Sequence, residues 1–359
     1  MARASTKYAI FLGAGASAAE GAALQSNLFR DYFMLLKKRA RSSPRPHEKK
    51  LSEFFLKMFD IDVRRGKLGN INFPTFEEAL GVLDLADMKN ESFKDFSITN
   101  FADGGSIKIL RIYLVFLMAD IIHDGLRRSN RLHHTLIKKL NSGNSIKDTV
   151  FLTTNYDILC DNALLDLYPE RKVDYGVDLA NYDDGTFYRP DLDAVKFYKL
   201  HGSLNWIYCP TCNNLRITPY QKGVYNLMVD PAISRCKVCK TVYAPIIVPP
   251  TFYKDMSKVF LNQVWSQTEK ELLKVDHLII CGYSFPDADI HIKYLMKRIQ
   301  KNRTKTKPLK ITVINSYPGK KATIKDEERS RYERFLGKDV DYTDFSFEQF
   351  ANNPFMIMR

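Results

Sequence analysis

Short, mostly apolar segments alternate with amphipathic stretches along much of this chain. Largely apolar segments of five to seven residues are typical of strands buried on both faces of a parallel sheet. Between them apolar residues recur at helical spacing, as in Asp289–Ile299. Strands that alternate with helices predict an open, doubly wound parallel α/β sheet. The expected strands are Tyr8–Leu12, Thr149–Thr153, Ala194–Leu200, His277–Gly282 and Lys310–Asn315.

Residues 24 to about 140 interrupt this alternation, because their pattern is almost entirely helical. Ile107–Leu126 predicts one long buried helix, and Arg41–His47 and Phe101–Ser106 contain the residues that typically separate helices. We therefore expect a helical insertion within the sheet domain. The expected segments are 1–20, 149–206 and 245–325 for the sheet domain, 21–148 for the helical insertion, 207–244 for a small cysteine module and 326–359 for a C-terminal segment.

Composition and charge restrict the classes of protein further. The 359 residues include 45% hydrophobic and 26% charged residues, which is ordinary for a soluble globular protein. The net charge of +13 favours acidic partners, either nucleic acid or an anionic substrate. The longest apolar stretch, Ile112–Ala119, is eight residues and too short to span a bilayer. With no apolar signal segment after Met1, we expect a cytoplasmic protein without a membrane anchor.

Four of the six cysteines form two Cys-x-x-Cys pairs, Cys209/Cys212 and Cys236/Cys239, with 23 residues between the pairs. This spacing predicts a tetrahedral zinc site of four thiolates. Because four thiolates leave no open position for a substrate, such a site is structural. Cys160 and Cys281 lie in apolar segments without a pairing pattern, which favours a reducing compartment.

Two polar motifs follow expected strands at their carboxyl ends, where open α/β sheets bind ligands. Gly13-Ala-Gly-Ala-Ser17 follows the first strand and precedes a helix, so its backbone could approach a phosphate group. Its alternative is a plain tight turn. Thr153-Thr-Asn-Tyr-Asp157 ends the second strand and places Asn155 and Asp157 two positions apart. Its alternative is an Asx turn in which Asp157 caps a helix.

Three further strand ends carry candidate residues. His201 follows the third strand, and Gly202 leaves room beside it for an imidazole that accepts a proton from a hydroxyl or water. Its alternative is a histidine that is hydrogen-bonded in the core. Gly282 and Ser284 follow the fourth strand and Asn315 ends the fifth, where each is equally compatible with an ordinary turn.

In this order, Gly-Ala-Gly-x-Ser, Thr-x-Asn-x-Asp, His-Gly, the two cysteine pairs, Gly-x-Ser and Val-Ile-Asn resemble the sirtuin superfamily over about 1–20 and 149–317. The resemblance implies a Rossmann-like NAD-binding fold of sirtuin type. It also implies these roles: phosphate contacts from Gly13, Ala14, Gly15, Ser17, Gly282 and Ser284, ribose and water positioning by Asn155, a nicotinamide contact from Asp157, a general base in His201, an adenosine ribose contact from Asn315, and zinc ligands in Cys209, Cys212, Cys236 and Cys239.

Three departures separate the chain from protein-deacylating sirtuins. Gly21–Ser26 lacks the Asp-Phe-Arg that follows their glycine loop, and Thr154 replaces the Gln before their catalytic Asn. Pro245–Thr251 replaces the segment that pairs with the substrate peptide, and prolines disfavour such strand addition. The forms Thr-Thr-Asn-Tyr-Asp, Lys-Leu-His-Gly-Ser and Gly-Tyr-Ser-Phe-x-Asp-x-Asp (282–289), together with the helical insertion, instead resemble the sirtuin-like NAD-hydrolysing effectors of bacterial antiphage defence. Within that group we favour the subunits encoded beside a HerA-type ATPase, on chain length.

This resemblance implies an NAD hydrolase that forms nicotinamide and ADP-ribose, depletes NAD and works as a homo-oligomer, with a HerA-type ATPase as a candidate partner. Two alternatives stay open. One is an NAD-dependent protein deacylase. The other is a non-catalytic NAD or ADP-ribose sensor that regulates a DNA-handling partner, in keeping with the net charge of +13. Asn155 and His201 argue against the sensor, because a sensor needs no general base.

Overall fold

The computed structural model describes most of the chain. The described residues are 7–39, 44–65, 68–98, 107–126, 131–168, 172–177, 180–181, 187–188, 190–218, 220, 223–229, 234–248, 259–304, 308–316 and 322–358. The chain divides into two compact units. The sheet unit comprises Met1–Gly21, Arg128–Val248 and Asp255–Arg359, and the helical unit comprises Ala22–Arg127 and Pro249–Lys254.

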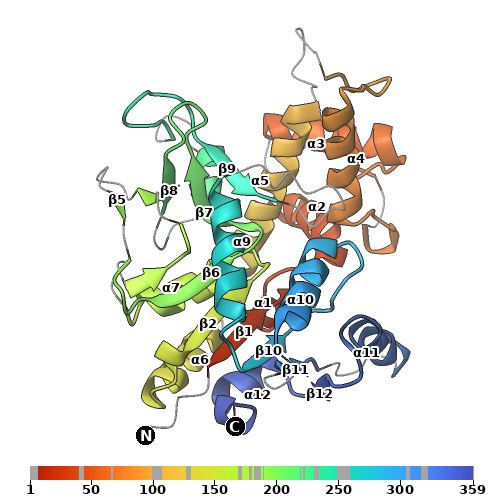
Figure 1. The fold of residues 1–359 in the computed structure, drawn as a ribbon. Helices are drawn as coiled ribbons and strands as arrows, with labels where there is room; N and C mark the ends of the chain where they lie inside the picture. The colour runs from red at the N-terminus through yellow and green to blue at the C-terminus, as the bar shows by residue number, and fades with distance from the viewer. Residues whose placement is uncertain are drawn as a thin grey trace, which may run out of the picture. The chain divides into compact units, whose positions relative to one another are not determined.

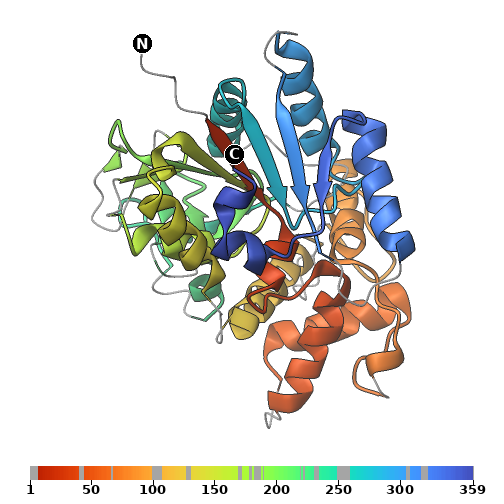
Figure 2. The ribbon, with the colours of Figure 1, turned by 90° about the horizontal axis from the view of Figure 1, so that it is seen from below.

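The sheet unit is built on a seven-stranded parallel sheet with the order β12-β11-β10-β1-β2-β6-β3 (Figures 1 and 2). All five expected strands are present, and β1 lies in the middle. Chain order reverses direction on either side of β1, so the carboxyl ends of β1 and β10 meet at the switch point where such sheets form ligand crevices. The strands are β1 (Tyr8–Leu12), β2 (Thr149–Thr153), β3 (Val173–Asp174), β6 (Val195–Lys199), β10 (His277–Cys281), β11 (Lys310–Ile314) and β12 (Asp341–Thr343).

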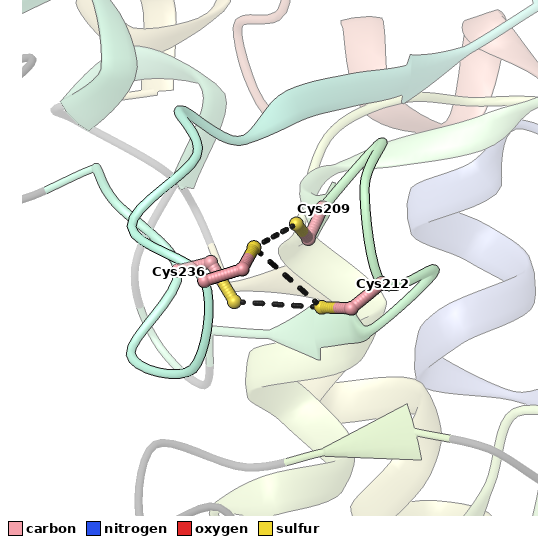
Figure 3. A group of neighbouring side chains, drawn as sticks. Cys209, Cys212 and Cys236 are labelled. Carbon is pink, nitrogen blue, oxygen red and sulfur yellow. Dashed lines mark hydrogen bonds between the residues drawn. The ribbon is translucent and has the colours of Figure 1, made fainter.

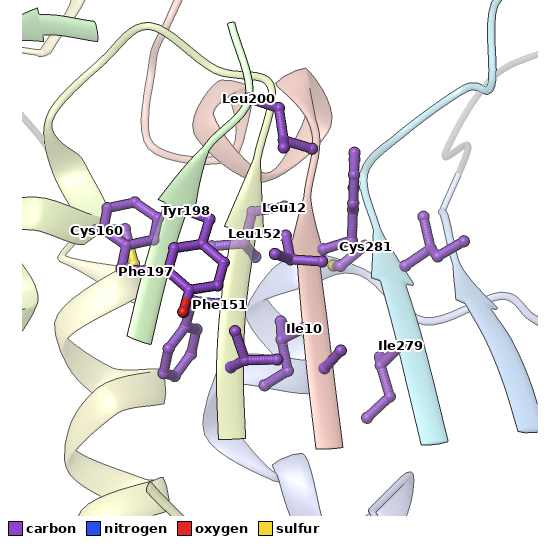
Figure 4. Packing of buried hydrophobic residues seen from close by; sticks show 14 of the residues in the cluster. Ile10, Leu12, Phe151, Leu152, Cys160, Phe197, Tyr198, Leu200, Ile279 and Cys281 are labelled. Atoms are coloured by element: carbon purple, nitrogen blue, oxygen red, sulfur yellow. The ribbon is translucent and has the colours of Figure 1, made fainter. Parts of the chain in front are cut away.

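Apolar side chains on the central strands form the core of the sheet unit. Every residue of β2 and β10 is buried, which explains why their sequences show no polar alternation. Figure 4 shows Ile10, Leu12, Leu152, Phe197 and Ile279 packed along neighbouring strands. The helices of this unit are α1 (Ala14–Ala18), α6 (Leu132–Ser142), α7 (Leu159–Leu165), α8 (Gly223–Val229), α9 (Val259–Leu272), α10 (Ile290–Asn302), α11 (Ala322–Leu336) and α12 (Phe347–Asn352).

A second sheet of five strands, in the order β5-β4-β8-β7-β9, completes the sheet unit. Its longest strand, β7, begins at Gly202, directly after the expected base His201, and its last residue, Tyr208, precedes Cys209. One strand therefore joins the two candidate sites. The strands are β4 (Ala180–Asn181), β5 (Phe187–Tyr188), β7 (Gly202–Tyr208), β8 (Leu215–Ile217) and β9 (Ala244–Ile247).

The helical unit has an aromatic core. The rings of Phe29 and Phe33 lie 4.7 and 5.2 Å from the ring of Phe55. The long helix expected over Ile107–Leu126 is confirmed as α5 (Ile107–Gly125), whose buried Asp120 receives a hydrogen bond from Arg39 at 2.6 Å. The other α-helices described here are α2 (Leu28–Arg39), α3 (Pro46–Phe59) and α4 (Phe76–Lys89).

The expected segment boundaries stay a prediction, but two features of the sheet unit bear on them. α6 falls within the segment assigned to the helical insertion, yet it packs against α7 and α12 of the sheet unit. β12 falls within the expected C-terminal segment and pairs with β11 in the main sheet. Among the described residues, none of the helices is both long enough and apolar enough to cross a membrane.

Candidate functional site

Two glycine loops interlock at the carboxyl ends of β1 and β10. The Gly15 amide donates to the Gly282 carbonyl at 2.7 Å, and the Gly13 amide donates to the Cys281 carbonyl at 2.9 Å. A Cβ on Gly15 would lie 2.9 Å from the Gly282 Cα, and Gly282 itself has a φ of +67°. Both glycines are needed for this close backbone approach. The amides of Gly13 and Gly15 therefore donate within the protein, and the expected phosphate contacts stay a prediction.

The Thr-Thr-Asn-Tyr-Asp motif bonds to the first glycine loop. The Asn155 Nδ2 donates to the Gly13 carbonyl and to the Ser17 Oγ, both at 2.8 Å. The Ser17 hydroxyl donates in turn to the Asp157 Oδ2 at 2.6 Å. The structure thus brings together three residues that the sequence predicted separately. The Asp157 Oδ1 also accepts the Leu159 amide at 3.0 Å, so the Asx turn of the alternative interpretation is present as well, but the N-cap of α7 is Ile158 and not Asp157.

His201 follows β6 as Asn155 follows the neighbouring strand β2. β2 and β6 pair in parallel with Thr153 opposite Lys199, and each candidate residue follows two positions later. His201 is 1% exposed, and its carbonyl accepts the Val248 amide at 3.0 Å. Its Nε2 lies 3.6 Å from the carboxylate of Asp289, a residue to which the sequence assigned no role in the site.

A buried ion pair, also missed from the sequence, lies beneath these residues. The Lys199 Nζ donates to the Asp161 Oδ2 and to the Asp157 carbonyl, both at 2.6 Å. The Lys199 and Asp161 side chains are 0% and 1% exposed. The Asp161 Oδ1 accepts from Tyr175 and Asn205, both at 3.1 Å, which satisfies the remaining lone pairs of the carboxylate. The one sequence signal was a lysine in an otherwise apolar strand end.

Asn315 and Ser284, the last candidates, already contact the protein. The Asn315 Nδ2 donates to the Tyr283 carbonyl at 3.1 Å and to the Glu328 carboxylate. Burial raises the pKa of the Glu328 carboxyl. Ser284 is exposed, and its carbonyl accepts from Arg331 at 3.2 Å. Their contacts with ribose and phosphate stay predictions.

The four expected zinc ligands meet in one cluster, which we call the cysteine cluster: Cys209, Cys212, Cys236 and Cys239 (Figure 3). Their sulfurs all lie within 4.8 Å of one another. A tetrahedron with Zn–S bonds of about 2.3 Å has edges of about 3.8 Å, so the donor set fits zinc. The hydrogen bond of the Cys239 sulfur with the Thr241 hydroxyl lowers the pKa of this thiol to about 6, which favours the thiolate that binds metal.

The two halves of the cysteine cluster have the same backbone shape. Cys209 and Cys236 each donate their amide to the carbonyl five residues later, at 2.9 and 2.8 Å. The fourth residue after each, Asn213 and Lys240, has a φ of 53° and 62°. This repeated tight turn aims two sulfurs from each pair at one point, which is why the local Cys-x-x-Cys spacing sufficed to find the site.

A family model described as the SIR2-like domain matches residues 149–339. This chain belongs to the SIR2-like domain family. The match spans the Thr-Thr-Asn-Tyr-Asp motif, His201 and the cysteine cluster. It confirms the family that the motifs resemble, and the parallel sheet confirms the expected fold class. Among curated proteins none matches the sequence significantly.

Solved structures that resemble this SIR2-like chain are distant in sequence. A mutant Sir2 with a p53 peptide and NAD is 13% identical, has a TM-score of 0.41, and matches over 98% of this chain and 94% of its own. A Sir2 homologue with NAD is 16% identical, has a TM-score of 0.40, and matches over 97% and 88%. A mutant Sir2 homologue with ADP-ribose is 15% identical, has a TM-score of 0.40, and matches over 97% and 90%.

Proposed function

We propose that this SIR2-like protein cleaves the bond between nicotinamide and ribose in NAD and releases nicotinamide and ADP-ribose. The observation that carries the proposal is that Asn155 and His201 each lie two positions beyond the paired ends, Thr153 and Lys199, of the adjacent strands β2 and β6. A water-positioning amide and a proton acceptor just beyond neighbouring strand ends suit a hydrolysis that needs both at one carbon atom.

The chemistry assigns one task to each residue. Nicotinamide departs with the electrons of the broken C–N bond, and a water oxygen forms the new bond to the ribose carbon. Both Asn155 Nδ2 hydrogen bonds go to the glycine loop, and its Oδ1 has no partner among the described residues. This oxygen is therefore available to orient the water. His201 accepts the proton that the water loses as it attacks.

The interlocked glycine loops support a dinucleotide as the ligand. They lie at the switch point of the sheet, where doubly wound folds bind pyrophosphates close to the backbone. Side chains at Gly13 or Gly15 would collide with the opposite loop and fill this approach. Gly13, Ala14, Gly15, Ser17, Asp157, Gly282, Ser284 and Asn315 remain the proposed NAD contacts.

Water, rather than an acyl-lysine, is the proposed acceptor. β9 is an edge strand of the second sheet, and a substrate peptide would have to add to such an edge. This strand has four residues and includes Pro245, which pairs with Ile207 and has no N–H to donate to a further strand. Pro249 and Pro250, which were also expected to interrupt the segment, lie outside the described residues.

The biological setting rests on the sequence resemblance alone. We propose an antiphage effector that depletes NAD, functions as a homo-oligomer and has a HerA-type ATPase as a candidate partner. A protein deacylase and an NAD or ADP-ribose sensor that regulates a DNA-handling partner are the alternatives that the experiment must separate.

The test is incubation with NAD alone and with an acetylated peptide, followed by chromatography of the products. We expect nicotinamide and ADP-ribose without peptide, and a loss of about 100- to 10,000-fold in His201→Ala and Asn155→Ala. His123→Ala, in α5, is the matched control and should cleave at the wild-type rate. Strict dependence on the peptide, with O-acyl-ADP-ribose as the product, would establish the deacylase. NAD binding without cleavage would establish the sensor.

A further inference from the structure

Asp289 places a buried carboxylate beside the proposed base. It precedes α10, and its side chain is 4% exposed, while that of His201 is 2% exposed. In the strand order β10-β1-β2-β6, the loop after β10 carries this carboxylate past the ends of β1 and β2 to reach His201. At 3.6 Å from the His201 Nε2, the carboxylate interacts with the ring through charge rather than through a short hydrogen bond.

The carboxylate is held in place from two sides. The Tyr283 hydroxyl donates to the Asp289 Oδ2 at 2.7 Å, which leaves Oδ1 as the oxygen closest to His201. The Asp289 amide donates to the Pro286 carbonyl at 3.2 Å, and its carbonyl accepts the Lys293 amide at 3.1 Å. The Tyr283 ring packs 4.9 Å from Phe11 of β1, so the loop is fixed to the centre of the sheet.

Other described groups near His201 are engaged in contacts of their own. The Tyr156 ring lies 6.3 Å from the imidazole, and its hydroxyl donates to the Val248 carbonyl at 2.8 Å. Trp265 of α9 donates to the Leu200 carbonyl at 3.0 Å. The nearby cation, Lys199, bonds to Asp161 and to the Asp157 carbonyl. Among the described residues, the carboxylate within ion-pair distance of the His201 ring is that of Asp289.

We infer that Asp289, fixed by Tyr283, is the carboxylate partner of His201 and stabilises the imidazolium that forms when His201 accepts a proton. The inference rests on the proposed function for its role in catalysis. The proton moves from the attacking water to His201, and Asp289 stays ionised throughout. Asp289 is thus a positioning residue that acts through His201, a role that the family resemblance did not assign to it.

Asp289→Asn tests this role because it removes the charge and keeps an oxygen for the Tyr283 hydroxyl. We expect kcat/KM for NAD cleavage to fall about 10- to 100-fold with KM nearly unchanged, because the charge acts on the proton transfer. The acidic limb of the pH–rate profile should move to lower pH, since an imidazolium without its counter-charge releases its proton more readily. Tyr283→Phe should show the same changes to a smaller degree.

The matched control is Asp287→Asn in the same loop, whose carboxylate is exposed and bonds to Lys293 and Arg334. It should keep the wild-type rate and pH profile. An Asp289→Asn protein that melts like wild type and keeps the wild-type rate and acidic limb would overturn the inference.

NMR titration of the His201 imidazole tests the pairing without any turnover. In Asp289→Asn the midpoint should move down by about one pH unit, whereas Asp287→Asn should leave it in place. This readout separates the two proposals. Should the wild-type protein fail to cleave NAD, the proposed function fails while a moved midpoint still supports the pairing, and an unmoved midpoint refutes it.

Discussion

The sheet unit contains two polar clusters that differ in how their polar atoms are satisfied. We call the first the strand-end cluster: Ser17, Asn155, Asp157, Lys199 and His201. Its polar groups donate to and accept from the protein, as in the 2.6 Å bonds of Lys199 and of Ser17. In the cysteine cluster the sulfurs contact one another at 3.3 to 4.0 Å, and thiols are weak partners for one another.

This difference indicates that the fold itself sets the geometry of the strand-end cluster, whereas the cysteine cluster depends on a metal ion. The strand-end cluster takes up its geometry when the sheet forms, because each member is bonded to a neighbouring strand or loop. In the cysteine cluster four sulfurs lie close together, and the binding free energy of a metal ion would stabilise this arrangement. The three predictions that follow test this contrast, from the largest expected effect to the smallest.

Metal removal should have the largest effect. Binding free energies of structural zinc are about 10–16 kcal/mol, so chelation or Cys236→Ser should unfold the module around the cysteine cluster. Zinc content by elemental analysis, together with the melting temperature, checks this. Cys160→Ala, outside the cluster, should keep about one zinc per chain. A purified wild-type protein that contains no metal and melts normally would show that this cluster, too, is stable by itself.

Breaking the buried ion pair should come next. Lys199→Met leaves the Asp161 carboxylate without its cation, which costs about 3–5 kcal/mol in the free energy of unfolding. Urea denaturation measures it. The double variant Lys199→Met with Asp161→Asn should recover more than half of the loss, because no buried charge remains. Lys196→Met on the same strand, which removes a partly exposed pair with Glu271, should cost about 1 kcal/mol or less. Equal losses at Lys199 and Lys196 would contradict the prediction.

The smallest expected effect concerns the interlocked loops. Gly15→Ala puts a Cβ 2.9 Å from the Gly282 Cα and 3.0 Å from its carbonyl oxygen, so the free energy of unfolding should fall by about 1–3 kcal/mol. Gly69→Ala, with open space around its Cβ position, is the control and should change stability by less than about 0.5 kcal/mol. Wild-type stability of Gly15→Ala would mean that the loops are not held as closely as the structure has them.

The sequence predicted those features that depend on residues close together in the chain. The five longer strands of the main sheet follow from apolar runs, and the cysteine cluster follows from spacing within two short turns. β3 and β12 have two and three residues, too few to produce a periodic signal. Asp161, Lys199 and Asp289 could not be found as partners, because each is a single charged residue whose counterpart is distant in the chain. Only the paired strands and the folded loop after β10 bring them together.

The central position of β1 determines when the proposed site can exist during synthesis. Tyr8 pairs with Thr149 and with His277, which follow 141 and 269 residues later (149 − 8 and 277 − 8). Until β10 and the loop after it have been synthesised, one edge of β1 lacks its neighbouring strand. Gly282 is then not present to bond to Gly15, and Asp289 is not present beside His201. Such distant pairing is formed late and slowly. A nascent chain that already carries Asn155, His201 and all four cysteines is therefore incomplete as an enzyme, and the proposed activity arises only when the last third of the chain joins the sheet.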